Sequence, residues 1–266
     1  MNALNENLVI VIPARKNSKR LKNKNFKNFF GFPLFEWSLA AGLFLKQQLI
    51  GLREISIVCT SDDDQILDLV KKKYESTVLS VQRKPELSDD NAILSDVIFD
   101  CIYRLAERHV IHLNKYLAGG FILLQPTSPI RLKDDLVSFC RQIKNLGNNL
   151  SMVSVNKNYS EIKDIYEIIK FSEARSDFLL GHIGKKLLKV QDIKKHSESA
   201  FVDGSLYLGF MSMLKEKGFM PAGKTLAFPL SIKRSIDIDT EKEFEDALVL
   251  INELQNLEIE YVSPKI

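Results

Sequence analysis

Two groups of charged residues in this sequence could together bind a polyphosphate and a metal ion. The first is the basic loop at positions 12–25, with the sequence IPARKNSKRLKNKN and no acidic residue. Its cations and backbone N–H groups could neutralise a triphosphate. The loop is neither a GxxxxGK[ST] nor a GxGxxG motif. A run of cations is also typical of a solvated surface loop, so composition alone leaves both interpretations open.

The second group is an acidic pair near the C-terminus, Asp237 and Asp239 in the segment SIDIDT. Residues two apart on a strand point to the same face, so both carboxylates could bind one Mg²⁺ ion. Alternatively, Asp239 and Thr240 could form a turn that caps the following helix. Glu243 stands at the position that completes a capping box with Thr240.

Short apolar runs alternate with amphipathic segments, and this pattern predicts the elements that must position both groups. We expect strands at 8–12, 54–60, 77–81, 120–124, 151–155, 205–210 and 235–239, and helices at 33–45, 62–74, 95–109, 133–146 and 241–257. The alternation predicts an α/β, doubly wound, mainly parallel sheet, with functional loops beyond the carboxyl ends of its strands. We expect one domain, residues 1–266, in which 156–200 breaks the rhythm as an excursion or arm.

The basic loop resembles the signature loop of CMP-sugar synthetases, the acylneuraminate-type cytidylyltransferases. Further segments resemble that family in the same order: GFPL at 31–34, TSDDD at 60–64, LQPTSPIR at 124–131 and SIDIDT at 235–240. The resemblance implies a Rossmann-like nucleotidyltransferase fold. It also implies transfer of CMP from CTP to the anomeric hydroxyl of an acidic sugar, with release of pyrophosphate and use of a divalent metal, Mg²⁺.

The resemblance also implies roles for individual residues. Catalysis would rest on Arg15, Lys24 and Asp239, and the metal would be bound by Asp237 and Asp239. Nucleotide-binding positions would be Ala14, Arg15, Asn17, Ser18, Lys24, Asn25, Arg83 and Asp90. Sugar-binding positions would be Gln125, Thr127, Ser128, Asp203, Gly204 and Tyr207. An amide such as that of Gln125 can both donate and accept hydrogen bonds to a sugar. Arg83 could instead be a surface cation, and Arg131 could be structural.

The sequence departs from the sialic-acid branch of that family on the sugar side. The segment 190–202, VQDIKKHSESAFV, contains no arginine, and Asp203 stands where asparagine is usual. These differences favour another nine-carbon acid, similar to legionaminic or pseudaminic acid. Three alternatives stay open: an enzyme of the Kdo-activating type, a metal-dependent glycosyltransferase using the Asp62–Asp64 run, and a CTP-binding homologue without activity. That run is more typical of a helix N-terminus.

The composition indicates which partners and which cellular compartment to expect. A net charge of +3 and a pI of about 8.6 are too mild to indicate a nucleic-acid partner. Cys59, Cys101 and Cys140 lie in apolar stretches without a CxxC pair, which predicts buried, reduced thiols. No apolar run is as long as a membrane span, and we expect an enzyme that has no signal peptide and works in the cytoplasm. The resemblance further implies a homodimer formed through the arm at 156–200.

Overall fold

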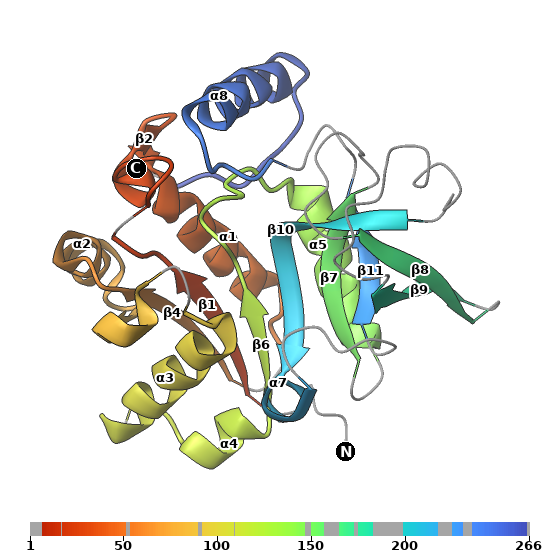
Figure 1. The fold of residues 1–266 in the computed structure, drawn as a ribbon, viewed down its shortest axis with the longest axis horizontal. Helices are drawn as coiled ribbons and strands as arrows, with labels where there is room; N and C mark the ends of the chain where they lie inside the picture. The colour runs from red at the N-terminus through yellow and green to blue at the C-terminus, as the bar shows by residue number, and fades with distance from the viewer. Residues whose placement is uncertain are drawn as a thin grey trace.

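The computed structural model describes residues 7–16, 18–51, 54–89, 92–108, 110–146, 150–156, 165–172, 175–182, 199–217, 225–230 and 236–264. A nine-stranded sheet runs through them in the order β5-β4-β1-β6-β10-β7-β11-β9-β8 (Figure 1).

Four parallel strands form the half of the sheet that begins at the N-terminus. They are β1 (Leu8–Pro13), β4 (Ile55–Ser61), β5 (Leu79–Gln82) and β6 (Gly120–Leu123). The central strand β1 pairs with both β4 and β6, and Ile10 lies opposite Ile57 and Ile122. Strands that are buried on both faces need continuous apolar sequence, which explains the LVIVI run of β1. The predicted parallel sheet is confirmed here.

Helices cover both faces of this half of the sheet. Alternate residues of β1 enter different cores, with Ile10 in one and Val11 in the other. The first core is covered by α1 (Leu34–Gln48), α2 (Asp64–Tyr74) and α5 (Lys133–Asn145). The second is covered by α3 (Leu94–Glu107), α4 (Leu113–Leu117) and α7 (Met211–Lys217). The two layers confirm the predicted doubly wound α/β fold.

The other half of the sheet is mixed. Strand β10 (Ser199–Phe210) runs antiparallel to β6 and to β7 (Ser151–Asn156), and β11 (Thr225–Pro229) runs parallel to β7. Strands β8 (Ile165–Ser172) and β9 (Arg175–His182) pair antiparallel. β9 pairs with β11 and β8 with the start of β10, so these five strands close a ring of pairings.

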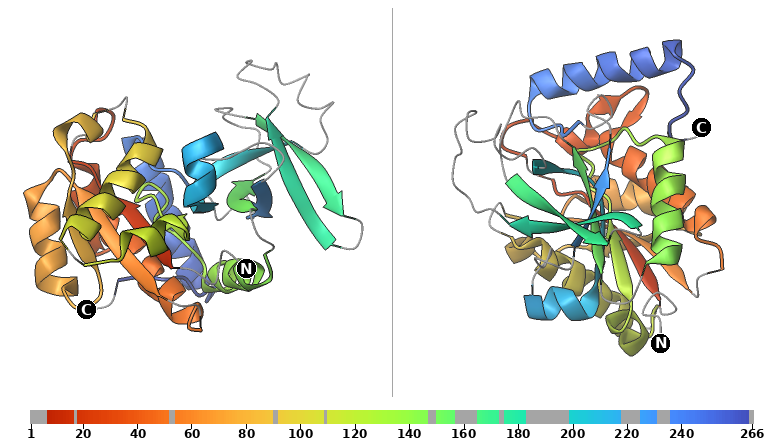
Figure 2. Two further views of the ribbon diagram at one scale, coloured as in Figure 1. Left: turned by 90° about the horizontal axis from the view of Figure 1, so that it is seen from below. Right: turned by 90° about the vertical axis from the view of Figure 1, so that its right-hand side faces the viewer.

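The region 156–200, expected to be an arm, therefore contains the strands β8 and β9, which extend from the rest of the fold (Figure 2). The sequence pattern did not predict β8, β9 or β11. The remaining positions of that region lie outside the described residues. Strand β10 also begins earlier than the predicted strand at 205–210.

A third core joins the N-terminal loops to the last helix, α8 (Glu241–Asn256). Trp37 of α1 packs edge-on against Phe29, with ring centroids 5.1 Å apart, and its indole N–H donates to the Phe29 carbonyl at 3.0 Å. Phe29 in turn meets Phe244 of α8. Three short elements lie in this region: η2 (Lys24–Phe26), β2 (Asn28–Phe29) and β3 (Phe32–Pro33). This packing holds the basic loop next to the start of α8.

Two local predictions need correction. Helix α2 begins at Asp64, two residues later than expected, because the side chain of Asp63 caps it by accepting from the Gln65 N–H. A strand was expected at 235–239, but the described residues 236–239 form no sheet pairing; the Ile238 N–H bonds to a loop carbonyl instead. In the part of the chain that the structure describes, no helix is both long and apolar enough to cross a bilayer.

Candidate functional site

The basic loop is fixed to its neighbours where it leaves the carboxyl end of β1. The N–H of Ala14, which is fully buried, donates to the Thr60 carbonyl at 2.9 Å. The N–H of Lys16 donates to Asp62 Oδ1 at 2.7 Å, and the side chain of Asn25 donates to the Arg15 carbonyl at 2.7 Å. Asn25 is buried as well. The backbone of the loop is thus held in place at both ends, unlike a purely solvated run of cations.

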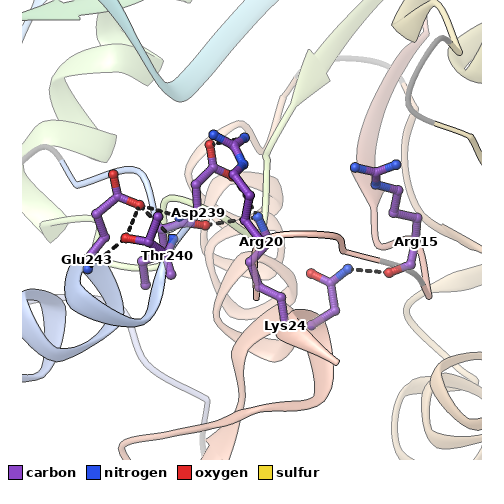
Figure 3. Close-up of polar contacts among 8 residues, drawn as sticks. Arg15, Arg20, Lys24, Asp239, Thr240 and Glu243 are labelled. Atoms are coloured by element: carbon purple, nitrogen blue, oxygen red, sulfur yellow. Dashed lines mark hydrogen bonds and ion pairs between the residues drawn. The ribbon is translucent and has the colours of Figure 1, made fainter. Parts of the chain in front are cut away.

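Lys24 and Arg20 both reach the carboxylate of Asp239 (Figure 3). Lys24 Nζ lies 2.9 Å from Asp239 Oδ1 and 2.9 Å from the Ile238 carbonyl oxygen. Arg20 Nη2 lies 2.6 Å from Asp239 Oδ2. Lys24 is only 8% exposed, whereas Arg20 lies at the surface. The structure therefore brings together the predicted phosphate-binding lysine and a predicted metal ligand.

The acidic segment is anchored on both sides. The Ile238 N–H donates to the Thr127 carbonyl at 2.7 Å, which ties this segment to the loop after β6. Glu243 Oε2 accepts from the N–H groups of Asp239 and Thr240, each at 2.7 Å, and the Thr240 hydroxyl accepts from Glu243 N–H. The predicted capping box is confirmed. The cap fixes the backbone of Asp239, so capping and metal binding do not exclude each other.

The donor set of the acidic segment fits a hard divalent cation. Ile238 is buried while Asp237 and Asp239 are partly exposed, as expected when an extended segment alternates its side chains. The described residues contain no group of three or more histidine, cysteine or acidic side chains that could hold a metal. Mg²⁺ commonly uses one or two carboxylates and takes its other ligands from water and substrate phosphates. Asp237 and Asp239 suit that mode of binding.

Arg83 is buried and is not a surface cation. It is 6% exposed, its Nη2 donates to the Thr60 carbonyl at 3.0 Å, and its N–H donates to the Ser61 carbonyl at 2.7 Å. Burial lowers the pKa of the Arg83 guanidinium below its ordinary value. Among the described residues its buried Nε has no hydrogen-bond partner. A guanidinium here, beside the carboxyl end of β4, can still donate to a bound molecule.

Three of the predicted sugar-binding residues lie around a fourth, Gly204. This glycine has a φ of +81°, and a Cβ placed on it would lie 3.0 Å from Gln125 Oε1 and 3.4 Å from Ser128 Oγ. The hydroxyl of Tyr207 would be 3.9 Å away. The register of β10 against β7 shifts between Val202 and Tyr207, so the strand bulges at this point. The loop after β6 and the β10 bulge thus form one group of polar side chains.

The carboxylate of Asp203 is directed into the protein. Its Oδ1 accepts from the Ser154 hydroxyl and from the Ser205 N–H, the latter at 2.9 Å, and the residue is buried. Its carbonyl accepts from Ser128 Oγ at 3.4 Å. The hydrogen bonds of Asp203 to Ser154 of β7 and to the Ser205 N–H of β10 account for an acidic residue next to a site expected to receive an acidic sugar.

Four further predicted site residues lie apart from these contacts or outside the described part of the chain. Asn17 and Asp90 lie outside the described residues. Ser18 is half-buried, and Arg15 lies to one side of the Lys24–Asp239 cluster in Figure 3. Sequence reasoning missed Arg20 as a partner of Asp239 and Ser154 as a partner of Asp203. No local pattern could reveal these pairs, because 219 and 49 positions separate their members.

Known proteins resemble this chain over most of its length. A family model described as Cytidylyltransferase matches residues 9–167. A CMP-N,N'-diacetyllegionaminic acid synthase of Legionella pneumophila is 30% identical over 237 residues, which cover 88% of this chain and 91% of the relative. A pseudaminic acid cytidylyltransferase of Campylobacter jejuni is 26% identical over 90% of this chain and 94% of the relative.

A solved structure supports the fold independently. It is a CMP:2-keto-3-deoxy-manno-octonic acid synthetase in complex with CTP, which superposes with a TM-score of 0.63 at 15% identity. The superposition covers 92% of this chain and 98% of that protein. At this level of identity the likeness establishes the fold and not the substrate.

Proposed function

The chain belongs to the cytidylyltransferase family, and from this premise we propose that it transfers CMP from CTP to the anomeric hydroxyl of an acidic nine-carbon sugar, with release of pyrophosphate. The observation that carries the proposal is the contact of Lys24 with Asp239. This contact joins a loop suited to phosphates to a segment suited to a divalent metal. The bond between Ile238 N–H and the Thr127 carbonyl adds the sugar-side loop to the same region.

The proposed acceptor is a nonulosonic acid of the legionaminic, pseudaminic or sialic type. The names of the two relatives specify legionaminic and pseudaminic acids, and both relatives align over nearly their whole length. Gln125, Ser128 and Tyr207 supply amide and hydroxyl groups around Gly204, which suit a polyhydroxylated ligand.

In the proposed reaction the anomeric oxygen attacks the α-phosphorus of CTP in line with the leaving pyrophosphate. A bond forms between that oxygen and the α-phosphorus, the bond from the α-phosphorus to the oxygen that bridges it to the β-phosphate breaks, and the proton of the anomeric hydroxyl is released to water. Such a reaction depends on alignment and on neutralising phosphate charge. Arg15 and Lys24 would provide positive charge, while the fixed backbone at Ala14 and the bond from Asn25 to the Arg15 carbonyl hold the loop in position.

We propose that Asp237 and Asp239 hold Mg²⁺ at this site. When bound, the ion supplies charge neutralisation for the phosphate oxygens of CTP. The chain's own contribution is the orientation of the carboxylates, because Glu243 binds the N–H of Asp239 and the Thr127 carbonyl binds the N–H of Ile238.

The contacts of the Asp62–Asp64 run do not favour the glycosyltransferase alternative. Asp62 Oδ1 accepts from the Lys16 N–H, and Asp63 Oδ1 accepts from the Gln65 N–H as the cap of α2. Both carboxylates therefore serve local structure. The alternative of an enzyme that activates Kdo (2-keto-3-deoxy-manno-octonic acid) has support from the fold alone. The CMP:2-keto-3-deoxy-manno-octonic acid synthetase is only 15% identical to this chain.

We further propose a cytoplasmic homodimer in which the β8–β9 region contributes to the contact between subunits. These strands extend from the rest of the fold (Figure 2), as a contact element would. Sedimentation equilibrium of the full chain at micromolar concentration tests this proposal; a monomer mass at all concentrations would refute it.

The proposed reaction is tested by measuring pyrophosphate release from CTP and Mg²⁺ with a panel of sugars. The panel contains N,N'-diacetyllegionaminate, pseudaminate, N-acetylneuraminate and Kdo, with a reaction lacking sugar as the blank. We expect release that requires a nonulosonate and CTP, and little with UTP or ATP. Release with Kdo alone would overturn the acceptor class, and no release with any sugar would overturn the proposed reaction.

A further inference from the structure

Arg131 is a buried guanidinium that joins three separate elements. It stands at the end of the loop after β6 and is 3% exposed. Its Nε donates to the Ser205 carbonyl on β10 at 3.0 Å, and its Nη1 donates to Ser38 Oγ on α1 at 3.1 Å. Its Nη2 donates to the Gln125 carbonyl at 3.0 Å. One side chain thereby fixes the sugar-side loop to a helix and to a neighbouring strand.

The acceptors of these three hydrogen bonds are neutral oxygens. Burial lowers the pKa of Arg131 to about 9, and the negative charge of Asp203 opposes this shift. A buried cation among neutral acceptors is costly, and apolar residues often replace buried charges without loss of stability. Stability alone therefore does not account for an arginine here. The planar guanidinium group accounts for the arginine, because it can donate hydrogen bonds in three fixed directions at once.

Two of the groups that Arg131 binds are backbone carbonyls in the proposed sugar site, those of Gln125 and Ser205. Gln125 is held through its carbonyl, which also accepts from Ser38 Oγ at 3.1 Å. Ser205 is held at both ends, since its carbonyl binds Arg131 and its N–H binds Asp203 Oδ1. Gly204 directly precedes Ser205, and a Cβ placed on it would lie 3.0 Å from Gln125 Oε1. The separation of the loop from the β10 bulge is thus set through Arg131.

We propose that Arg131 is a positioning residue for the sugar substrate, fixing Gln125 relative to the Gly204 bulge without touching the substrate itself. The inference rests on the proposed function, because it assumes that these residues receive the sugar. In this proposal the role of Arg131 differs from that of Arg15 and Lys24, which would bind the nucleotide. A change at Arg131 should therefore affect the two substrates unequally.

The test compares Arg131→Lys with the wild-type chain in steady-state kinetics and in CTP binding by calorimetry. Lysine keeps the charge but cannot donate in three fixed directions. We expect kcat/KM for the nonulosonate to fall roughly 10- to 100-fold, mainly through KM, since displacements of about 1 Å can have effects of that size. The dissociation constant for CTP should stay within about twofold, because the phosphate loop is untouched. Arg141→Lys, at an exposed position of α5, is the matched control.

A second variant covers the case in which Arg131→Lys does not fold. Ser38→Ala removes one acceptor of Arg131 and one donor to the Gln125 carbonyl from a helix that tolerates alanine. We expect it to raise KM for the sugar about two- to fivefold with unchanged CTP affinity. The inference would be overturned if folded Arg131→Lys had the wild-type KM for the sugar or, where that variant does not fold, if Ser38→Ala had it. Equal losses of affinity for the sugar and for CTP would overturn it as well. A wild-type chain that uses no nonulosonate would instead overturn the proposed function, and this inference with it.

Discussion

The ammonium group of Lys24 lies 2.9 Å from Oδ1 of Asp239, although 215 positions separate the two residues. The same ammonium donates to the Ile238 carbonyl at 2.9 Å, and Lys24 is almost completely buried. A charge-assisted bond removed from water is stronger and more directional than a surface ion pair. This contact therefore fixes the end of the basic loop against the acidic segment, and the proposed nucleotide and metal sites become neighbours (Figure 3).

The charge of Asp239 should be required for metal-dependent turnover. Asp239→Asn keeps an oxygen that can accept from Lys24 but removes the negative charge needed by a divalent cation. We expect Mg²⁺-dependent pyrophosphate release to fall by about 100-fold or more, with an unchanged circular dichroism spectrum. Asp246→Asn, at an exposed position of α8, is the control and should keep wild-type activity. Full activity of Asp239→Asn would remove Asp239 from the proposed metal site.

Arg15 should contribute to CTP affinity. Arg15→Ala removes a cation at the carboxyl end of β1 while leaving the Arg15 carbonyl for Asn25. Calorimetric titration should give a dissociation constant for CTP about 10-fold or more above wild type, as expected for a lost hydrogen bond to a charged group. Lys22→Ala, an exposed lysine of the same loop, should change the affinity much less. Equal losses in the two variants would indicate a general effect of loop charge.

The space beside Gly204 should limit sugar binding. A Cβ at this position would lie 3.0 Å from Gln125 Oε1, so the Gln125 side chain must move in Gly204→Ala. We expect KM for the sugar to rise with little change in the affinity for CTP. Gly51→Ala is a close control, because Gly51 also has a positive φ, +103°, but a Cβ there meets nothing within 4 Å. If both variants lose a similar amount of stability and neither changes the KM for the sugar, Gly204→Ala acts through backbone strain alone and the space beside Gly204 does not limit sugar binding.

The cap of α8 should affect both stability and the metal site. Thr240→Ala removes the side-chain acceptor for the Glu243 N–H and should lower the free energy of unfolding by about 1 kcal/mol in urea titrations. Because Glu243 also binds the N–H of Asp239, the half-saturating Mg²⁺ concentration should rise. Thr77→Ala, which removes a surface hydroxyl bonded to the Tyr74 carbonyl, should change stability by less and leave the Mg²⁺ dependence unchanged.

The three thiols should be unreactive in the folded chain. Burial raises the pKa of Cys59 to about 12, and it raises those of Cys101 and Cys140 to about 12 as well. The thiolate is the reactive form, so a raised pKa leaves these buried groups protonated near pH 8. Ellman's reagent at that pH should detect almost no thiol in the native protein and all three in denaturant. Rapid reaction of a native thiol would contradict the burial seen here.

Local sequence patterns were sufficient to predict the elements of this protein that depend on neighbouring residues. The apolar run of β1 predicted a strand buried on both faces, and the spacing of Thr240 and Glu243 predicted the capping box that the structure confirms. Both signals are short-range, because strand burial and helix capping depend on residues only a few positions apart. The order of the motifs also predicted the family.

Contacts between distant side chains could be seen only in the folded structure. The bond between Lys24 and Asp239, the burial of Arg83, and the three bonds of Arg131 to α1, β10 and the Gln125 loop all join segments far apart in the chain. Strands β8, β9 and β11 went unpredicted for a related reason: their stability comes from pairing with strands elsewhere in the sheet. Local periodicity carries no information about such partners, since they are chosen only when the layers pack together.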